Sequence, residues 1–291
     1  MKILVIGVLR YESGKTSFAL ELLNSFKEVG IDIYPYKPIG GHSGWYQYTT
    51  IINSIKLGKL VGEDAYHYAE AINCIECIEQ ISPLDFLLIP YDIKFYQGRI
   101  RSYIDLIDDV FKQIILVRLT TMADDGFRTV HYLVKDNYKY ILESMENILR
   151  DLVKSIKYII EIGVKELTSL ILNPELYYML DNILAYHESR HELVLIESFN
   201  DVALPIPSAI NSLYVVVVAP GRVLLYDGNN FRRAVEIVSD VFRPLALSTS
   251  SILRIMKQPL LSLPIPPKQL IYTGVSKTAN DIVSYIINHI K

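Results

Sequence analysis

The hydrophobic pattern at the start of the chain predicts a strand, a loop and a helix in that order. Lys2–Val8 is almost wholly apolar and has the length of a short buried strand. Lys15–Val29 instead repeats its apolar residues at helical spacing, and Gly30 stands where a C-terminal helix cap belongs. The predicted buried face of this helix consists of Phe18, Ala19, Leu22, Leu23 and Phe26. Leu9–Gly14 is therefore expected to be a loop that connects the strand to the helix.

Strand and helix patterns alternate along most of the chain, which favours an α/β fold with a doubly wound, mostly parallel sheet. Further strands are predicted at Ile31–Tyr36, Ile114–Thr120, Arg128–Val134, Leu193–Ile196 and Leu213–Val218. The Asp-Gly pair at Asp125-Gly126 suits a hairpin turn between the second and third of these. A long amphipathic helix is expected around Tyr138–Ile162.

The 291 residues contain no long Gly/Ser linker, so a single domain spanning residues 1–291 is expected. We predict that its middle region, Tyr91–Arg190, is an inserted or enlarged α/β part. Such a region either shapes a substrate pocket or forms an oligomer interface, for example that of a homodimer.

Composition narrows the classes of partner. Apolar residues make up 51% and charged residues 21%, and the formal net charge of −3 gives no basic field for nucleic acid. No uncharged apolar run approaches the length of a membrane span, and the start of the chain lacks the features of a signal peptide. We therefore expect a cytoplasmic protein that binds neither nucleic acid nor membrane.

The chain has two cysteines, Cys74 and Cys77, in a C-x-x-C spacing within a helical pattern. One such pair without a second is weak support for a zinc site. Two buried thiols in a reducing cytosol are the preferred interpretation.

The predicted loop ends in Gly-Lys-Thr, which is the layout of a phosphate-binding loop, or Walker A motif. Backbone N–H groups of such a loop and of the helix start bind phosphate oxygens. Lys15 is expected to reach the β- and γ-phosphates of ATP, and the Thr16 hydroxyl to bind Mg²⁺. The usual pattern has glycine where this chain has Leu9, and the nearest upstream glycine is Gly7, which lengthens the loop. The predicted nucleotide-binding residues are Arg10, Glu12, Ser13, Gly14, Lys15, Thr16 and Ser17.

Two distant residues are expected to join this loop at the carboxyl edge of the sheet. Pro38 favours an extended conformation at Lys37, which places this lysine at the end of the second strand. Glu197 ends the buried strand pattern of Leu193–Ile196, where nucleotide hydrolases place a magnesium-associated carboxylate. Lys37, Lys15 and Glu197 are thus the candidate catalytic residues; the plainer alternative is that Lys37 and Glu197 are ordinary strand-end side chains.

The phosphate loop, the helix, the second strand and Lys37-Pro38-Ile39-Gly40 together resemble the dethiobiotin synthetase family and the related cobyrinic acid synthase-type P-loop ATPases. The resemblance places Lys15, Thr16 and Lys37 at the family's phosphate and magnesium positions. It also implies that an aspartate in the following region completes the magnesium shell, for which Asp64 is the best candidate. An acidic residue at a helix start is also a helix-stabilising feature in its own right.

The resemblance implies Mg²⁺-dependent ATP hydrolysis, with phosphoryl transfer that activates a small-molecule carboxylate, carbamate or amine. After Glu197 the chain reads Ser198-Phe199-Asn200-Asp201-Val202 instead of the family's glycine-rich stretch, which argues against dethiobiotin synthesis itself. Arg10 stands where related partition-type ATPases carry a second loop lysine. One alternative function is a nucleotide-operated switch or partner-regulated ATPase without a small-molecule substrate. The other is a non-catalytic relative whose altered loop no longer binds phosphate well. The sequence leaves the choice between ATP and GTP open.

Overall fold

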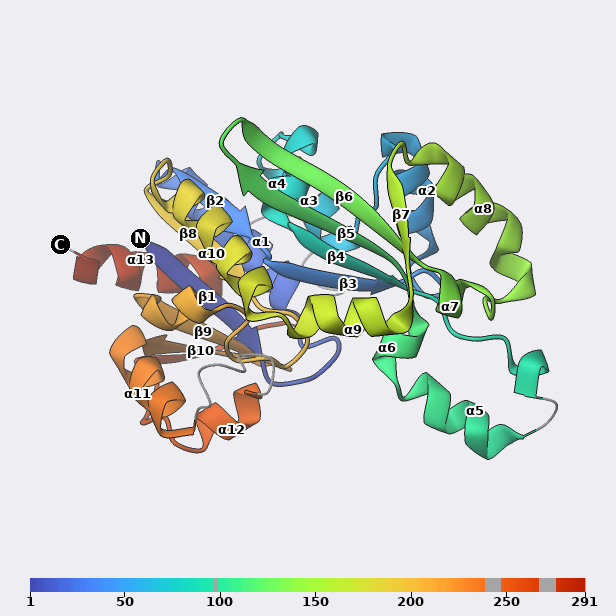
Figure 1. Cartoon of the computed structure of the whole chain (residues 1–291). Helices are drawn as coiled ribbons and strands as arrows, with labels where there is room; N and C mark the ends of the chain where they lie inside the picture. Colours follow the sequence, from blue (N-terminus) through green and yellow to red (C-terminus); the bar gives the residue numbers. More distant parts are fainter. Residues whose placement is uncertain (97–98, 239–246, 267–275, 291) are drawn as a thin grey trace. The chain divides into compact units, whose positions relative to one another are not determined.

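A computed structural model of the chain describes residues 1–96, 99–238, 247–266 and 276–290 (Figure 1). It divides into two compact units. The first unit comprises Met1–Pro38, Ala71–Asn73 and Tyr177–Lys291, and the second comprises Ile39–Glu70 and Cys74–Leu176. The enlarged region predicted at Tyr91–Arg190 has different bounds from either unit. Whether the two units form a single domain stays a prediction.

The first unit is built on a mixed sheet, with six strands among the described residues, in the order β11-β10-β9-β1-β8-β2 (Figure 1). Strands β9, β1, β8 and β2 are parallel, whereas β10 and β11 add to the β9 edge in antiparallel fashion. The bounds are β1 Lys2–Gly7, β2 Ile33–Tyr36, β8 Leu193–Glu197, β9 Tyr214–Ala219, β10 Arg222–Asp227 and β11 Leu261–Pro264. Apolar residues fill the four parallel strands because both faces of this sheet are covered.

Helices flank this sheet, and α1 packs against α13. The helices of the first unit are α1 Lys15–Glu28, α10 Pro174–Glu188, η4 Pro207–Asn211, α11 Gly228–Val238, α12 Thr249–Leu253 and α13 Lys277–Ile290. The predicted apolar face of α1 is buried from Phe18 to Phe26, which fixes the helix that follows the candidate phosphate loop.

The second unit has its own mixed sheet, with five strands among the described residues, in the order β3-β4-β5-β6-β7. Its strands are β3 Ile39–Ser43, β4 Leu84–Leu88, β5 Ile114–Ala123, β6 Gly126–Val134 and β7 Ile159–Ile162. The predicted hairpin between β5 and β6 is confirmed, because Ala123 pairs with Gly126 across an Asp-Asp turn. The α/β class is therefore confirmed, although strands form two mixed sheets and not one mostly parallel sheet.

Helices of the second unit surround a separate apolar core that includes Ile51, Leu60, Leu116 and Leu149. They are α2 Tyr48–Leu57, α3 Glu63–Ala71, η1 Ile75–Cys77, α4 Ile78–Ile81, η2 Ile93–Tyr96, α5 Ile100–Ile107, α6 Val110–Gln113, α7 Lys135–Tyr138, η3 Glu143–Met145, α8 Glu146–Ser155 and α9 Val164–Leu172.

The long helix predicted at Tyr138–Ile162 is wrong in its extent. Helix α8 covers only Glu146–Ser155, and the chain becomes extended at Ile156. Ile159–Ile162 then forms β7, which pairs in parallel with β6. The β-branched residues of this segment favour a strand where the edge of β6 is open for pairing. The apolar residues of the strand continue the helical spacing of α8, so the sequence pattern did not reveal where the helix ends.

The two cysteines are not buried thiols, as predicted, but form a disulfide between Cys74 and Cys77. Both residues are partly exposed at the turn between α3 and α4. The helical pattern is interrupted here, because Asn73 adopts a left-handed conformation with φ 54°.

A row of polar side chains crosses the sheet of the second unit at Asp85, Arg118 and His131, which are register partners on β4, β5 and β6. Arg118 is fully buried and donates to the Ser82 carbonyl, and the Asp85 carboxylate lies 3.3 Å from Nδ1 of His42. Burial, together with the Arg118 charge, lowers the pKa of His131 to about 4. Burial alone would raise the pKa of Asp85, but His42 and Arg118 hold it below its ordinary value.

Candidate functional site

The loop between β1 and α1 presents backbone amides at the start of a helix. Gly14 precedes α1 with φ 83°, and Glu12 is also left-handed at φ 53°. Alternation of left-handed and ordinary backbone turns N–H groups toward one side, which creates an anion-binding concavity. Within Lys15–Glu28, the first turn carries no acidic residue and Gly14 provides no side-chain cap. The positive end of the α1 dipole is therefore open to an anionic ligand.

Gly7 supplies the space that lets this long loop fold back over the end of β1. A Cβ atom at position 7 would lie 2.9 Å from Cγ and Cδ of Lys15 and would also collide with Ser13 Oγ. Only glycine accommodates this approach without displacement of a neighbour. The close approach of the loop thus requires a glycine at the last residue of β1, although position 9 is leucine.

The side chain of Lys15 is buried and held across the loop. Its ammonium donates to the Asn200 carbonyl at 2.6 Å and to Ser13 Oγ at 3.2 Å. Asn200 has φ 45°, a left-handed conformation that asparagine tolerates better than most residues. Lys15 therefore connects the candidate phosphate loop to the segment that follows β8.

The Glu197 carboxylate binds side chains that follow the two parallel strands on either side of β8, which are β1 and β2. The Thr16 hydroxyl and the Lys37 ammonium each donate to Glu197 Oε1 at 2.8 Å. The side chain of Glu197 is 1% exposed and that of Lys37 is 7% exposed. Because β1, β8 and β2 are neighbours in the sheet, their carboxyl ends bring these residues together. Removal of either partner of this buried ion pair would leave an uncompensated buried charge.

The structure thus brings together Lys15, Thr16, Lys37 and Glu197 from three separate stretches of the first unit. Ser13 and Gly14 belong to the same loop, while Arg10 and Glu12 are exposed and Ser17 is half-buried. The Arg10 guanidinium lies over the Tyr11 ring. Asp64 belongs to the second unit, where it lies half-buried in the first turn of α3. Its role in magnesium binding stays a prediction.

Sequence reasoning missed the contribution of Asn200. The contact with Lys15 uses a backbone carbonyl, which carries no residue-type signal. The available clue was an asparagine three residues after a buried strand, since asparagine is enriched at left-handed positions.

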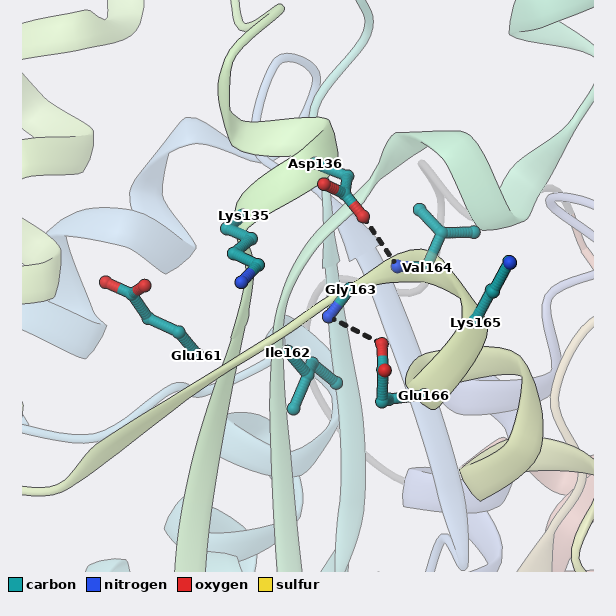
Figure 2. A pocket seen from close by; sticks show the side chains of 8 residues that line it. All are labelled: Lys135, Asp136, Glu161, Ile162, Gly163, Val164, Lys165 and Glu166. Carbon is teal, nitrogen blue, oxygen red and sulfur yellow. Dashed lines mark hydrogen bonds between the residues drawn. The ribbon is translucent and has the colours of Figure 1, made fainter.

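A pocket of about 690 Å³ in the second unit lies beside another helix start, that of α9 (Figure 2). Here carboxylates already accept from the backbone, with Asp136 bonded to Val164 N at 3.1 Å and Glu166 bonded to Gly163 N at 3.0 Å (Figure 2). Two negative charges at these amides disfavour an anionic ligand. The start of α1 has no such side-chain cap at Gly14, so it stays the candidate anion site.

The fold and this geometry define an α/β protein with two mixed sheets and a buried Lys–Glu–Thr cluster at the carboxyl edge of the first. No protein-family model, curated protein or solved structure matches the chain. In the part of the chain that the structure describes, no helix is both long enough and apolar enough to cross a bilayer.

Proposed function

We propose that the protein is a Mg²⁺-dependent P-loop ATPase that resembles dethiobiotin synthetase in its nucleotide site. The amides of the loop and the Lys15 ammonium bind the β- and γ-phosphates, and Lys37 neutralises charge that develops during transfer. Phosphoryl transfer requires mainly positioning and charge neutralisation, which these groups provide. The observation that carries the proposal is the convergence of Thr16 and Lys37 on Glu197, beside an uncapped helix start.

The donor set around Thr16 fits magnesium that is shared with a nucleotide. The Thr16 hydroxyl donates a hydrogen bond to Glu197, so its lone pairs are available to a cation. Across the described ranges, no group of three or more His, Cys, Asp or Glu side chains is arranged to hold a metal ion. Mg²⁺ usually takes one or two protein ligands together with phosphate oxygens and waters. When bound, the ion neutralises phosphate charge.

The proposed second substrate is a small molecule with a carboxylate, carbamate or amine. Lys37 lies next to Glu197 at the strand edge, where an ammonium can attract an anionic acceptor group. Phosphorylation of a carboxylate or carbamate oxygen would activate it for ring closure or amide formation.

Lys15→Ala tests nucleotide binding directly. We expect isothermal titration calorimetry with Mg²⁺ and a non-hydrolysable ATP analogue to show binding to the wild type and none to this variant, because the buried ammonium would contact the phosphates. Lys27→Ala is the matched control, since Lys27 is an exposed lysine near the other end of α1 and donates to the Ala71 carbonyl. Unchanged affinity in Lys15→Ala would refute the proposal.

A nucleotide-operated switch is the second candidate, and the contact between Lys15 and Asn200 favours it. The segment after Asn200 is tied to the start of α12, with Thr249 N bonded to Asp201 O at 2.7 Å and Ala203 N bonded to Leu247 O at 2.8 Å. On nucleotide binding, the Lys15 ammonium would leave the Asn200 carbonyl and bind phosphate instead. The segment around Asn200 would then be released from this contact and could change its conformation. Turnover separates the candidates: a switch hydrolyses ATP slowly alone and faster with its partner.

A further inference from the structure

The Cys74–Cys77 disulfide closes a ring across only two intervening residues, in the turn between α3 and α4. Both cysteines are partly exposed, and Glu76 between them is exposed. Bridges that close short loops constrain the unfolded chain least, and accessible bridges exchange most readily. These features are unlike those of a disulfide that a fold needs for its stability.

Core residues on both sides of the bridge hold the turn without it. Tyr68 and Ala69 on α3 are buried, as are Ile78 and Ile81 on α4. Backbone hydrogen bonds add to this, since Cys74 N donates to Ala69 O at 2.8 Å and Cys77 N donates to Cys74 O at 3.0 Å. The sulfur atoms can therefore separate while the two helices stay packed.

The bridge also stands where the chain passes from one compact unit to the other. Ala71–Asn73 belongs to the first unit and Cys74 begins the longer segment of the second. The Ala71 carbonyl accepts from Lys27 Nζ of α1 at 2.7 Å. A covalent constraint at this position acts on a connecting segment and not on a core.

We propose that Cys74 and Cys77 form a thiol–disulfide exchange site whose partner is a dithiol. A thiolate of the dithiol attacks one sulfur of the bridge, which forms a mixed disulfide and releases the other cysteine as a thiolate that takes up a proton. The second thiol of the reductant then attacks the mixed disulfide and releases the second cysteine. Two electrons and two protons pass to the protein, and the dithiol becomes a disulfide. This proposal is independent of nucleotide binding.

Alkylation of the folded full-length protein tests it. Under native conditions, intact mass after N-ethylmaleimide should show no adduct before reduction and two after treatment with dithiothreitol. Oxidised dithiothreitol should return the count to zero. The thermal midpoint of the reduced protein should lie within about 3 °C of that of the oxidised protein, because the helices remain anchored. Cys74→Ser and Cys77→Ser should each take up one adduct with or without reductant.

Three outcomes would overturn the proposal. Two adducts without reductant in freshly purified, oxidised protein would mean that no bridge forms. Adducts that appear only after denaturation would mean that a dithiol cannot reach the sulfurs. Loss of cooperative unfolding on reduction would mean that the bridge serves the stability of the fold.

Discussion

At the residue scale, one carboxylate oxygen of Glu197 accepts from both a hydroxyl and an ammonium. The sequence could predict this group, because Lys37 and Glu197 each end a strand and the carboxyl ends of parallel strands share an edge. It could not predict the carbonyl of Asn200 or the reason for Gly7, since both depend on how the loop returns over β1. Contacts made by backbone atoms, or allowed by the absence of a side chain, leave little trace in the sequence.

Glu197→Gln should slow ATP hydrolysis by about 100-fold or more while nucleotide affinity changes little, because the carboxylate would bind magnesium directly or through water beside the reacting phosphate. Steady-state turnover and calorimetric titration measure the two effects separately. Glu28→Gln, an exposed site at the end of α1, should leave both unchanged. Equal losses of binding and turnover in Glu197→Gln would contradict the assigned role.

Gly7→Ala should lower stability by about 1–3 kcal/mol, the usual cost of overpacking, and should weaken nucleotide binding. The added methyl group would displace Lys15 and Ser13. Gly41→Ala is the control, because a Cβ there would meet its nearest neighbour at an ordinary 3.7 Å. Chemical denaturation provides the comparison, and equal stability of the two variants would show that the loop does not approach Gly7 as described.

At the scale of elements, strand and helix identities were predicted best where an independent signal marked the boundary. The Asp-Gly pair marked the β5–β6 hairpin, whereas no glycine or proline marked the change from α8 to β7 around Ile156. The polar row across β4, β5 and β6 was also missed, because single charged residues in apolar runs do not reveal that they are register partners. From the shifted pKa of His131 in this row, we expect the stability of the second unit to depend on pH.

Stability should fall as the pH is lowered from 7 to about 4. The folded state keeps His131 neutral down to a pKa of about 4, whereas the unfolded chain takes up a proton near pH 6.5. The unfolded state therefore binds more protons in this window, and acidification favours it by up to about 3 kcal/mol at the lower end. His131→Gln, which retains an acceptor for Leu60 N, should reduce this fall in urea denaturation series. A pH profile identical to that of the wild type would exclude His131 as its source.

At the scale of the whole molecule, each compact unit has its own sheet and its own buried core. Alternation of strands and helices was enough to predict the α/β class. It did not predict two sheets, because the pattern of one strand does not state which strand will be its neighbour. Apart from the predicted magnesium ligand Asp64, the candidate site consists of residues of the first unit, so we expect ligand binding to act mainly on that unit.

Scanning calorimetry should show two transitions, of which Mg²⁺ and a non-hydrolysable ATP analogue raise only one. Ligand at about 100 times its dissociation constant stabilises by about 2.7 kcal/mol, which corresponds to roughly 5–10 °C for a unit of this size. Lys15→Ala should abolish the shift. Equal displacement of both transitions would be evidence against a site confined to the first unit.

Strand β1, which leads into the candidate phosphate loop, has both of its sheet neighbours in the last hundred residues of the chain. β1 lies between β8 and β9, which begin at Leu193 and Tyr214. At a translation rate of about 5–20 residues per second, β1 is synthesised roughly 10–40 s before these partner strands. The second unit can acquire its sheet first, as its strands end at Ile162. Strand β1 therefore stays without its sheet neighbours while the second unit folds, and we expect the loop between β1 and α1 to be among the last parts of the chain to take its final form.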